Sequence, residues 1–420
     1  MSDSMDERLI PPKAKRGRSN ESEIEEENKD WFSELSDCIL LQILSFLEFK
    51  TAVQTCVLSS RWKDLWKRLP ILTLHSSDFS TYKDFDKFVP KILTLRDGSI
   101  SLEELDFEHQ GIIRPHLIKR VINYVVSHNV QRLKLDVTCD RTLMMPRIFT
   151  CHTLTSLKIT IGGRSMIDNF SSLPESVNLP ALTTLYLRNF KFSSSSGNDR
   201  ADPFSAFKRL NSLTIEGFYL PDARILCISS ATLVNLSICN YAWAPRDFCK
   251  VELSTPCLHR LTCYGNPTYY LCGSGLSSVK EVYMDIDLNW TMDKPEFPLI
   301  LLSWLQNLVD MTSLSVTTNT LQVLFLVPDF LKIKLPTLAN LKIFKIKKVR
   351  LSEALRGMVI KRMERQMVTT KSRIQAIRLV LEIGKWKARN EPFAPFPEGF
   401  SKFLDLQVLP FGTIVGTERR

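Results

Sequence analysis

The chain has 420 residues, of which 44% are hydrophobic, and a formal net charge of +10. No apolar run approaches the roughly eighteen residues that a membrane span needs, and the N-terminus lacks the pattern of a secretory signal, so we expect an intracellular protein without a membrane partner. The ten cysteines include no Cys-x-x-Cys pair, so neither a disulfide framework nor a zinc site is indicated, and nothing in the sequence requires a metal or a cofactor.

The N-terminal tail, residues 1–29, is polar and carries a basic run followed by an acidic run from Glu21 to Glu27. Such a composition cannot form a core, so the tail is predicted to be disordered. The basic run is a candidate nuclear localisation signal, with a solvated tail as the alternative, and we expect the protein in the nucleus, the cytoplasm or both. The signal residues are Lys13, Lys15, Arg16 and Arg18.

Residues 30–72 contain three short segments with helical patterns. The first, Cys38–Leu47, is apolar except for Gln42 and Ser45, and a helix that is apolar nearly all round belongs in a core or between two bodies. Three helices in about forty residues lie at the lower size limit for independent folding. The segment therefore predicts a module whose spare apolar surface docks onto another protein.

The second and third helices are predicted from caps and spacing. Thr51 and Gln54 fit a capping box that opens a helix at Ala52. The third helix carries a stripe at i, i+3, i+4 and i+7 after Ser59 or Ser60. That stripe consists of Trp62, Leu65, Trp66 and Leu69.

Residues 30–47 and 57–66 together resemble the F-box of plant F-box/leucine-rich-repeat proteins. The resemblance implies a trihelical module that binds Skp1 and, through it, a cullin-1 RING ubiquitin ligase. Ser36 and Glu48 stand where the family usually has proline, which would lower the affinity without removing an apolar contact. The implied Skp1 contacts are Leu35, Ile39, Leu40, Ile43, Leu44, Leu47, Trp62 and Trp66. A small helical core without a partner is the alternative.

The pattern apolar-x-x-Leu-x-apolar occurs ten times at a mean spacing of about 26 residues, and the copy at Val279 is the weakest match of the ten. This period is typical of leucine-rich repeats, which stack short parallel strands into a solenoid. We therefore predict an α/β solenoid over residues 73–350, an irregular horseshoe whose return segments mix helix, 3₁₀ helix and loop. Apolar stripes predict return helices at 117–126 and 301–308. The copies begin at Leu102, Val130, Leu154, Leu182, Leu210, Leu233, Leu258, Val279, Met311 and Leu338.

Residues 351–420 are predicted to form a basic helical cap, with helices at 351–366 and 372–387. Residues 341–420 hold 18 Lys or Arg against 7 Asp or Glu, a net charge of +11. A nucleic-acid-binding patch is one interpretation, but a solvated helix face is favoured because basic and aromatic residues do not alternate.

No nucleophile–base arrangement is recognisable, so we expect an adaptor without catalytic activity. The resemblance implies a substrate-recognition subunit of an SCF (Skp1–cullin-1–F-box) E3 ubiquitin ligase, with an unknown protein target on the concave sheet. That row of outward residues is predicted to change from basic at Arg132 to acidic at Glu281. The candidate target-binding residues are Arg132, Lys134, Tyr186, Arg188, Arg260, Tyr264, Tyr283 and Asp285. A repeat scaffold that no longer recruits Skp1 is the alternative.

Overall fold

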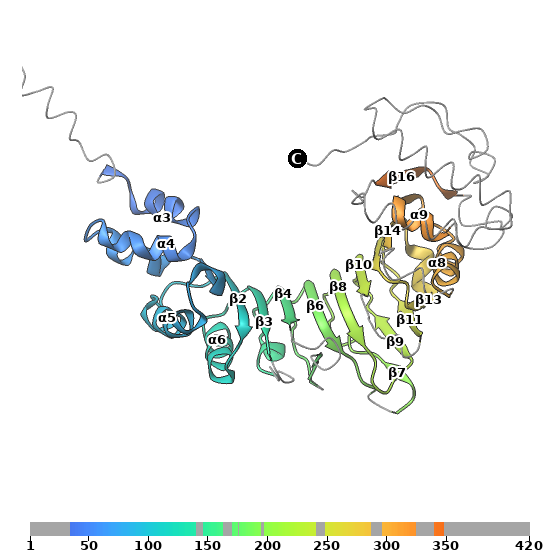
Figure 1. Cartoon of the computed structure of the whole chain (residues 1–420), viewed down its shortest axis with the longest axis horizontal. Coiled ribbons are helices and arrows are strands. Elements are labelled where there is room, and N and C mark those ends of the chain that lie inside the picture. Colours follow the sequence, from blue (N-terminus) through green and yellow to red (C-terminus); the bar gives the residue numbers. More distant parts are fainter. Residues whose placement is uncertain are drawn as a thin grey trace, which may run out of the picture. The chain divides into compact units, whose positions relative to one another are not determined.

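The computed structural model describes residues 34–139, 146–162, 170–174, 176–194, 197–240, 248–286, 296–324 and 340–347. The chain divides into two compact units, Met1–Leu69 and Pro70–Arg420 (Figure 1). The predicted tail, its nuclear signal and the predicted helical cap at 351–420 lie outside the described residues.

The first unit contains the three predicted helical segments, with different bounds and helix types. They are α3 (Asp37–Ser45), α4 (Phe49–Gln54) continued by the 3₁₀ helix η1 (Thr55–Val57), and the 3₁₀ helix η2 (Trp62–Arg68). The predicted capping box is wrong, because the N–H of Ala52 already donates to the carbonyl of Glu48 at 2.9 Å and Thr51 lies inside the helix. The stripe predicted for the third helix is buried as expected, although the backbone is 3₁₀.

The second unit is organised around a 12-stranded sheet in which every described pairing is parallel. Each of the ten predicted repeats supplies one strand, and neighbours in the chain are neighbours in the sheet (Figure 1). The repeat strands are β2 (Glu104–Ile112), β3 (Arg132–Thr138), β4 (Ser156–Gly162), β6 (Thr184–Lys191), β8 (Ser212–Tyr219), β10 (Asn235–Asn240), β12 (Arg260–Gly265), β14 (Glu281–Ile286), β15 (Ser313–Thr317) and β16 (Ile343–Lys347). The short strand β5 (Ser171–Ser172) pairs with β6.

The register follows the repeat. Leu133 on β3 pairs with Leu157 on β4, which pairs with Leu185 on β6, and all three side chains are at most 1% exposed. Along a strand, alternate side chains point to opposite faces, so these leucines line one side of the sheet and polar residues the other. The coarse fold prediction is therefore confirmed: a helical N-terminal module followed by a parallel sheet with one strand per repeat.

A second parallel sheet was not predicted. It runs in the order β13, β11, β9, β7, and its strands come from the return segments, where helix, 3₁₀ helix or loop was expected. The repeats that contain β9 and β11 are among the shortest, so the chain returns in extended form. The strands are β7 (Arg200–Ala201), β9 (Ile225–Ser229), β11 (Cys249–Ser254) and β13 (Tyr269–Cys272).

Helices fill the longer return segments. The two predicted stripes form α6 (Pro115–Ser127) and α8 (Glu296–Asn307), whose Trp304 donates from Nε1 to the carbonyl of Tyr269 at 2.8 Å. The sequence did not indicate β1 (Ile71–His75), α5 (Tyr82–Leu95) or α9 (Thr318–Leu324), nor the 3₁₀ turns η3 (Ser76–Asp78), η4 (Ile148–Thr150) and η5 (Ser274–Ser278). Among the described helices, none combines the length and apolarity that crossing a membrane requires.

Candidate docking and target-binding surfaces

Within residues 34–69, the described part of the first unit, five large apolar side chains are exposed to solvent. Phe46, Val57 and Leu58 are 80%, 84% and 65% exposed, and Ile39 and Leu47 are 45% and 39% exposed. We call these five residues the docking patch. Exposing several large apolar groups on so small a unit is costly in water, so these side chains are the candidate contacts for a partner.

The structure separates the eight residues proposed as Skp1 contacts into three groups. Leu40 and Leu44 are fully buried and Trp62 and Trp66 are nearly so, whereas Ile39 and Leu47 belong to the docking patch. Leu35 and Ile43 are half-buried. The four buried residues form the core of the unit and have little surface left for a partner.

Sequence reasoning missed Phe46, Val57 and Leu58. Phe46 follows the last residue of α3, and Val57 and Leu58 end the second helical segment, so none of them belongs to a helical stripe. Their exposure could have been suspected from the sequence, because these large apolar residues lie at helix ends and next to the polar Ser45 and Ser59.

One carboxylate connects the start of α3 to η2. Asp37 forms ion pairs with Arg61 at 3.0 Å and with Arg68 at 3.1 Å. Arg61 also donates a hydrogen bond to the carbonyl of Leu35. The hydrogen bond from Arg61 lowers the pKa of Asp37 below its ordinary value, so the carboxylate stays charged. Phe49 meets Trp66 edge to face with ring centroids 6.0 Å apart.

The two positions that depart from the family pattern already have proline-like backbone angles. Ser36 has φ −67° and Glu48 has φ −56°, both within the range of about −65 ± 15° that a proline ring imposes. Neither side chain makes a capping hydrogen bond. The backbone at both positions is therefore compatible with the proline that the family usually has there.

The eight candidate target-binding residues all lie on the polar face of the long sheet. Arg132 and Arg260 lie in one row of paired residues across the strands, and the others lie in the two adjacent rows. The second row contains Lys134, Tyr186 and Tyr283, and the third contains Arg188, Tyr264 and Asp285. The stacking of repeats brings them onto one face although they span more than 150 residues of chain.

The predicted change from basic to acidic along this face is wrong, because the basic residues face carboxylates on neighbouring strands. Lys134 on β3 meets Glu104 at 2.6 Å and Asp106 at 3.2 Å on β2. Arg188 likewise meets Glu216 at 3.3 Å. The outward residues of β2 are acidic and neutralise the basic outward residues of β3. The residue pattern within one strand does not reveal this pairing between strands.

Aromatic side chains flank an uncharged strip of this face. Tyr264 and Tyr283 meet edge to face at 6.4 Å, and Lys347 lies 4.3 Å from the Tyr283 ring centroid. Burial raises the pKa of Tyr186, whose hydroxyl donates to Glu216. In the row between Tyr186 and Tyr283 stand three small hydroxyl residues, Thr214, Ser237 and Thr262. We call these five residues of the row the target face.

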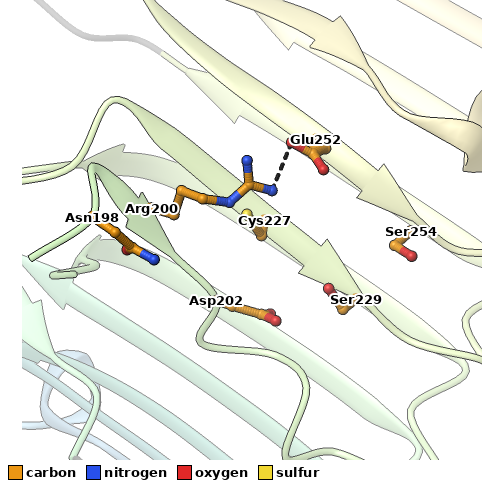
Figure 2. A pocket seen from close by; sticks show the side chains of 7 residues that line it. All are labelled: Asn198, Arg200, Asp202, Cys227, Ser229, Glu252 and Ser254. Atoms are coloured by element: carbon orange, nitrogen blue, oxygen red, sulfur yellow. Dashed lines mark ion pairs between the residues drawn. The ribbon is translucent and has the colours of Figure 1, made fainter. Parts of the chain in front are cut away.

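A shallow pocket of about 190 Å³ lies on the second sheet (Figure 2). Arg200 reaches across Cys227 to Glu252 with an ion pair of 2.8 Å. Burial raises the pKa of the Cys227 thiol, so the reactive thiolate is disfavoured. In this pocket the charges of Arg200 and Glu252 are therefore paired with each other, the Cys227 thiolate is disfavoured, and the Asp202 carboxylate also lines the wall. Across the described ranges no group of three or more His, Cys, Asp or Glu could hold a metal ion.

Residues 32–74 match the family model of the F-box domain. The chain is thus an F-box protein, and its match covers the helical unit together with the start of the sheet at β1.

The relatives define the family more closely. The chain is 34% identical over 218 residues to F-box/LRR-repeat protein 13 of Arabidopsis thaliana, which covers 50% of this chain and 46% of that protein. An F-box/FBD/LRR-repeat protein of the same plant is 32% identical over 221 residues, covering 50% of this chain and 46% of the relative. A putative F-box/FBD/LRR-repeat protein is 26% identical over 337 residues, covering 76% of this chain and 69% of the relative. The chain belongs to the plant F-box/leucine-rich-repeat family, and it spans about half the length of the first two relatives.

Proposed function

We propose that this chain is the substrate-recognition adaptor of an SCF E3 ubiquitin ligase. In this role the first unit docks onto a Skp1-like protein, which connects it to cullin-1 and a RING subunit, and the repeats hold a protein target. The docking patch carries the proposal, since it remains exposed although the core of the unit is already complete.

The energetic argument rests on the exposed side chains. Fully burying a side chain such as Phe46 or Leu58 contributes roughly 1.5–3 kcal/mol relative to leaving it in water. A few such residues at the centre of an interface dominate its affinity. We therefore assign the principal Skp1 contacts to the docking patch, with Leu35 and Ile43 at its margin, and a supporting role to Leu40, Leu44, Trp62 and Trp66.

The adaptor does no bond chemistry under this proposal. It raises the effective concentration of a target lysine near the ubiquitin-loaded enzyme, which accelerates transfer without a catalytic residue of its own. Residues 30–72 then constitute the F-box and 73–350 an irregular horseshoe. The target contacts the target face and its neighbours Arg132, Lys134, Arg188, Arg260, Tyr264 and Asp285.

The test is co-expression with a plant Skp1-like protein, followed by size-exclusion chromatography. We expect a stoichiometric complex with the wild type and none with the Phe46→Glu/Leu58→Glu double variant, because a charge cannot be buried unpaired. Leu299→Glu is the matched control, since Leu299 is 51% exposed on α8 in the second unit. Circular dichroism must show that all three chains are folded.

Charge substitutions at Leu40 or Leu44 would be uninformative, because they would unfold the unit rather than block docking. A wild-type chain that is folded and does not bind would contradict the adaptor role and favour the repeat scaffold with a decayed F-box. Binding by the double variant would contradict the assignment to the docking patch.

A further inference from the structure

A cleft between α5 and α6 in the second unit has two arginines and no acidic residue among its described lining residues. Its volume is about 410 Å³, and it opens to solvent beside the exposed side chains of Thr94, Arg120 and Arg147. The lining consists of Leu93, Thr94, Arg120, Asn123, Tyr124, Ser127 and Arg147. None of these residues belongs to the docking patch, to the target face or to the pocket on the second sheet.

Hydrogen bonds hold both guanidinium groups at the cleft. Arg120 on α6 donates from Nη2 to Oγ1 of Thr94 at 2.7 Å and to the carbonyl of Pro90 at 3.4 Å, both on α5. Arg147, just before η4, donates from Nη1 to Oδ1 of Asn123 at 2.6 Å. Arg120 and Asn123 are three residues apart on α6 and share one helix face, so the two guanidinium groups flank the same space.

The partners of these arginines are electrically neutral. In the described part of the chain, neither Arg120 nor Arg147 has a carboxylate within ion-pair distance. By contrast, Arg132 pairs with Glu104 at 2.8 Å, and Arg200 pairs with Glu252 in the pocket of the second sheet (Figure 2). The cleft therefore keeps two uncompensated positive charges, each with N–H donors left over from its five.

We propose that this cleft binds a phosphate monoester group. A guanidinium presents parallel donors that match two phosphate oxygens, and two such groups suit the dianion that a phosphate monoester forms above its second pKa of about 6. A single carboxylate carries less charge and fewer acceptor atoms. Because the cleft is open, the group can enter while attached to a larger molecule such as a phosphorylated peptide. The proposal is independent of Skp1 binding.

The test uses the full chain and isothermal titration calorimetry with three probes: inorganic phosphate, a short peptide with one phosphoserine, and the same peptide without phosphate. We expect the two phosphate probes to bind and the unmodified peptide not to bind. Affinity should fall when the pH is lowered from 7 to 5, as the phosphate becomes a monoanion. Tighter binding of the phosphopeptide would assign the site to a protein-borne phosphate, and equal binding would assign it to free phosphate esters.

Substitutions locate the binding. Arg120→Gln and Arg147→Gln should each weaken phosphate binding by about tenfold or more, the scale of one charge-assisted hydrogen bond. Arg200→Gln is the matched control and should change nothing, since its charge is already paired with Glu252. Equal weakening by all three variants, binding of the unmodified peptide, or no phosphate binding by the wild type would each overturn the proposal. Thermal unfolding would verify that the variants are folded.

Discussion

Charged side chains on the long sheet pair across neighbouring strands. Arg132 with Glu104, Arg188 with Glu216 and Arg260 with Glu281 all join residues of adjacent repeats. Their arginine side chains are 40–60% exposed, and ion pairs of this kind contribute about 0–1 kcal/mol each to stability. Because each pair contributes so little, the buried leucines beneath the sheet supply most of the stability.

His75 on β1 should make the stability of the second unit depend on pH. The hydrogen bond to Asp106 raises the pKa of His75 above its ordinary value of 6.5, so the folded chain holds that proton more tightly than the unfolded chain. This contribution is complete below pH 6.5 and is lost as the pH rises through the raised pKa. Glu108 and Asp78 act in the same direction.

Urea unfolding between pH 6 and 8 measures this effect. The free energy of unfolding of the wild type should fall over that range, and His75→Gln should remove that part of the fall. An unchanged slope in the variant would show that the His75–Asp106 pair does not couple protonation to folding.

Among the elements, the turn into η5 depends most directly on a single residue. Gly273 has φ +109°, and a Cβ atom there would lie 2.7 Å from the backbone nitrogen of Leu253 on β11. Without a side chain, the backbone at Gly273 can pack directly against the backbone of β11 just before η5 begins. An L-residue meets both an unfavourable φ and a backbone that cannot move aside.

We therefore expect Gly273→Ala to lower the free energy of unfolding by about 3 kcal/mol or more. Gly197 is the matched control, since its φ is +67° and a Cβ there would meet nothing within 4 Å. Gly197→Ala should cost about 1–2 kcal/mol, the price of the left-handed conformation alone. Equal costs in urea unfolding would show that the contact with Leu253 is relieved at little expense.

At the scale of the whole molecule, the two compact units have separate cores. Leu44 is fully buried in the first unit and Leu157 in the second, where each repeat contacts its neighbours along the sheet. Loss of packing in one core should therefore leave the other intact.

Hydrogen exchange measured by mass spectrometry tests this separation. Leu44→Ala should cost about 2–5 kcal/mol and speed exchange in residues 34–69, with no change around β4. Leu157→Ala should speed exchange around β4 and leave residues 34–69 unchanged. Acceleration in both units from either variant would show that they unfold as one.

Local patterns were sufficient for the ten repeat strands of the main sheet and for the helices α6 and α8, but not for β1. In the repeat, the central leucine and the apolar residue two positions later point to the same face of a strand. This spacing predicted the strand and its buried face in all ten repeats. The second sheet was missed because its strands have no repeated motif. Thr51 was misplaced as a cap because α4 begins at Phe49, which is buried against Trp66.

The sequence by itself determined that this chain has a small apolar helical module and a stack of leucine-rich repeats, because both depend on residue spacing within a short segment. The tertiary structure decided which apolar residues remain exposed. Leu44 and Phe46 are both apolar and lie two positions apart, but Leu44 is fully buried in the unit in which α3 packs against α4 and η2, whereas Phe46 is 80% exposed. It also decided the charge balance, because that balance depends on neighbours that are distant in sequence. On the long sheet, carboxylates of neighbouring strands neutralise basic residues such as Lys134 and Arg188. At the α5–α6 cleft, Arg120 and Arg147 donate hydrogen bonds to neutral groups and have no carboxylate partner among the described residues.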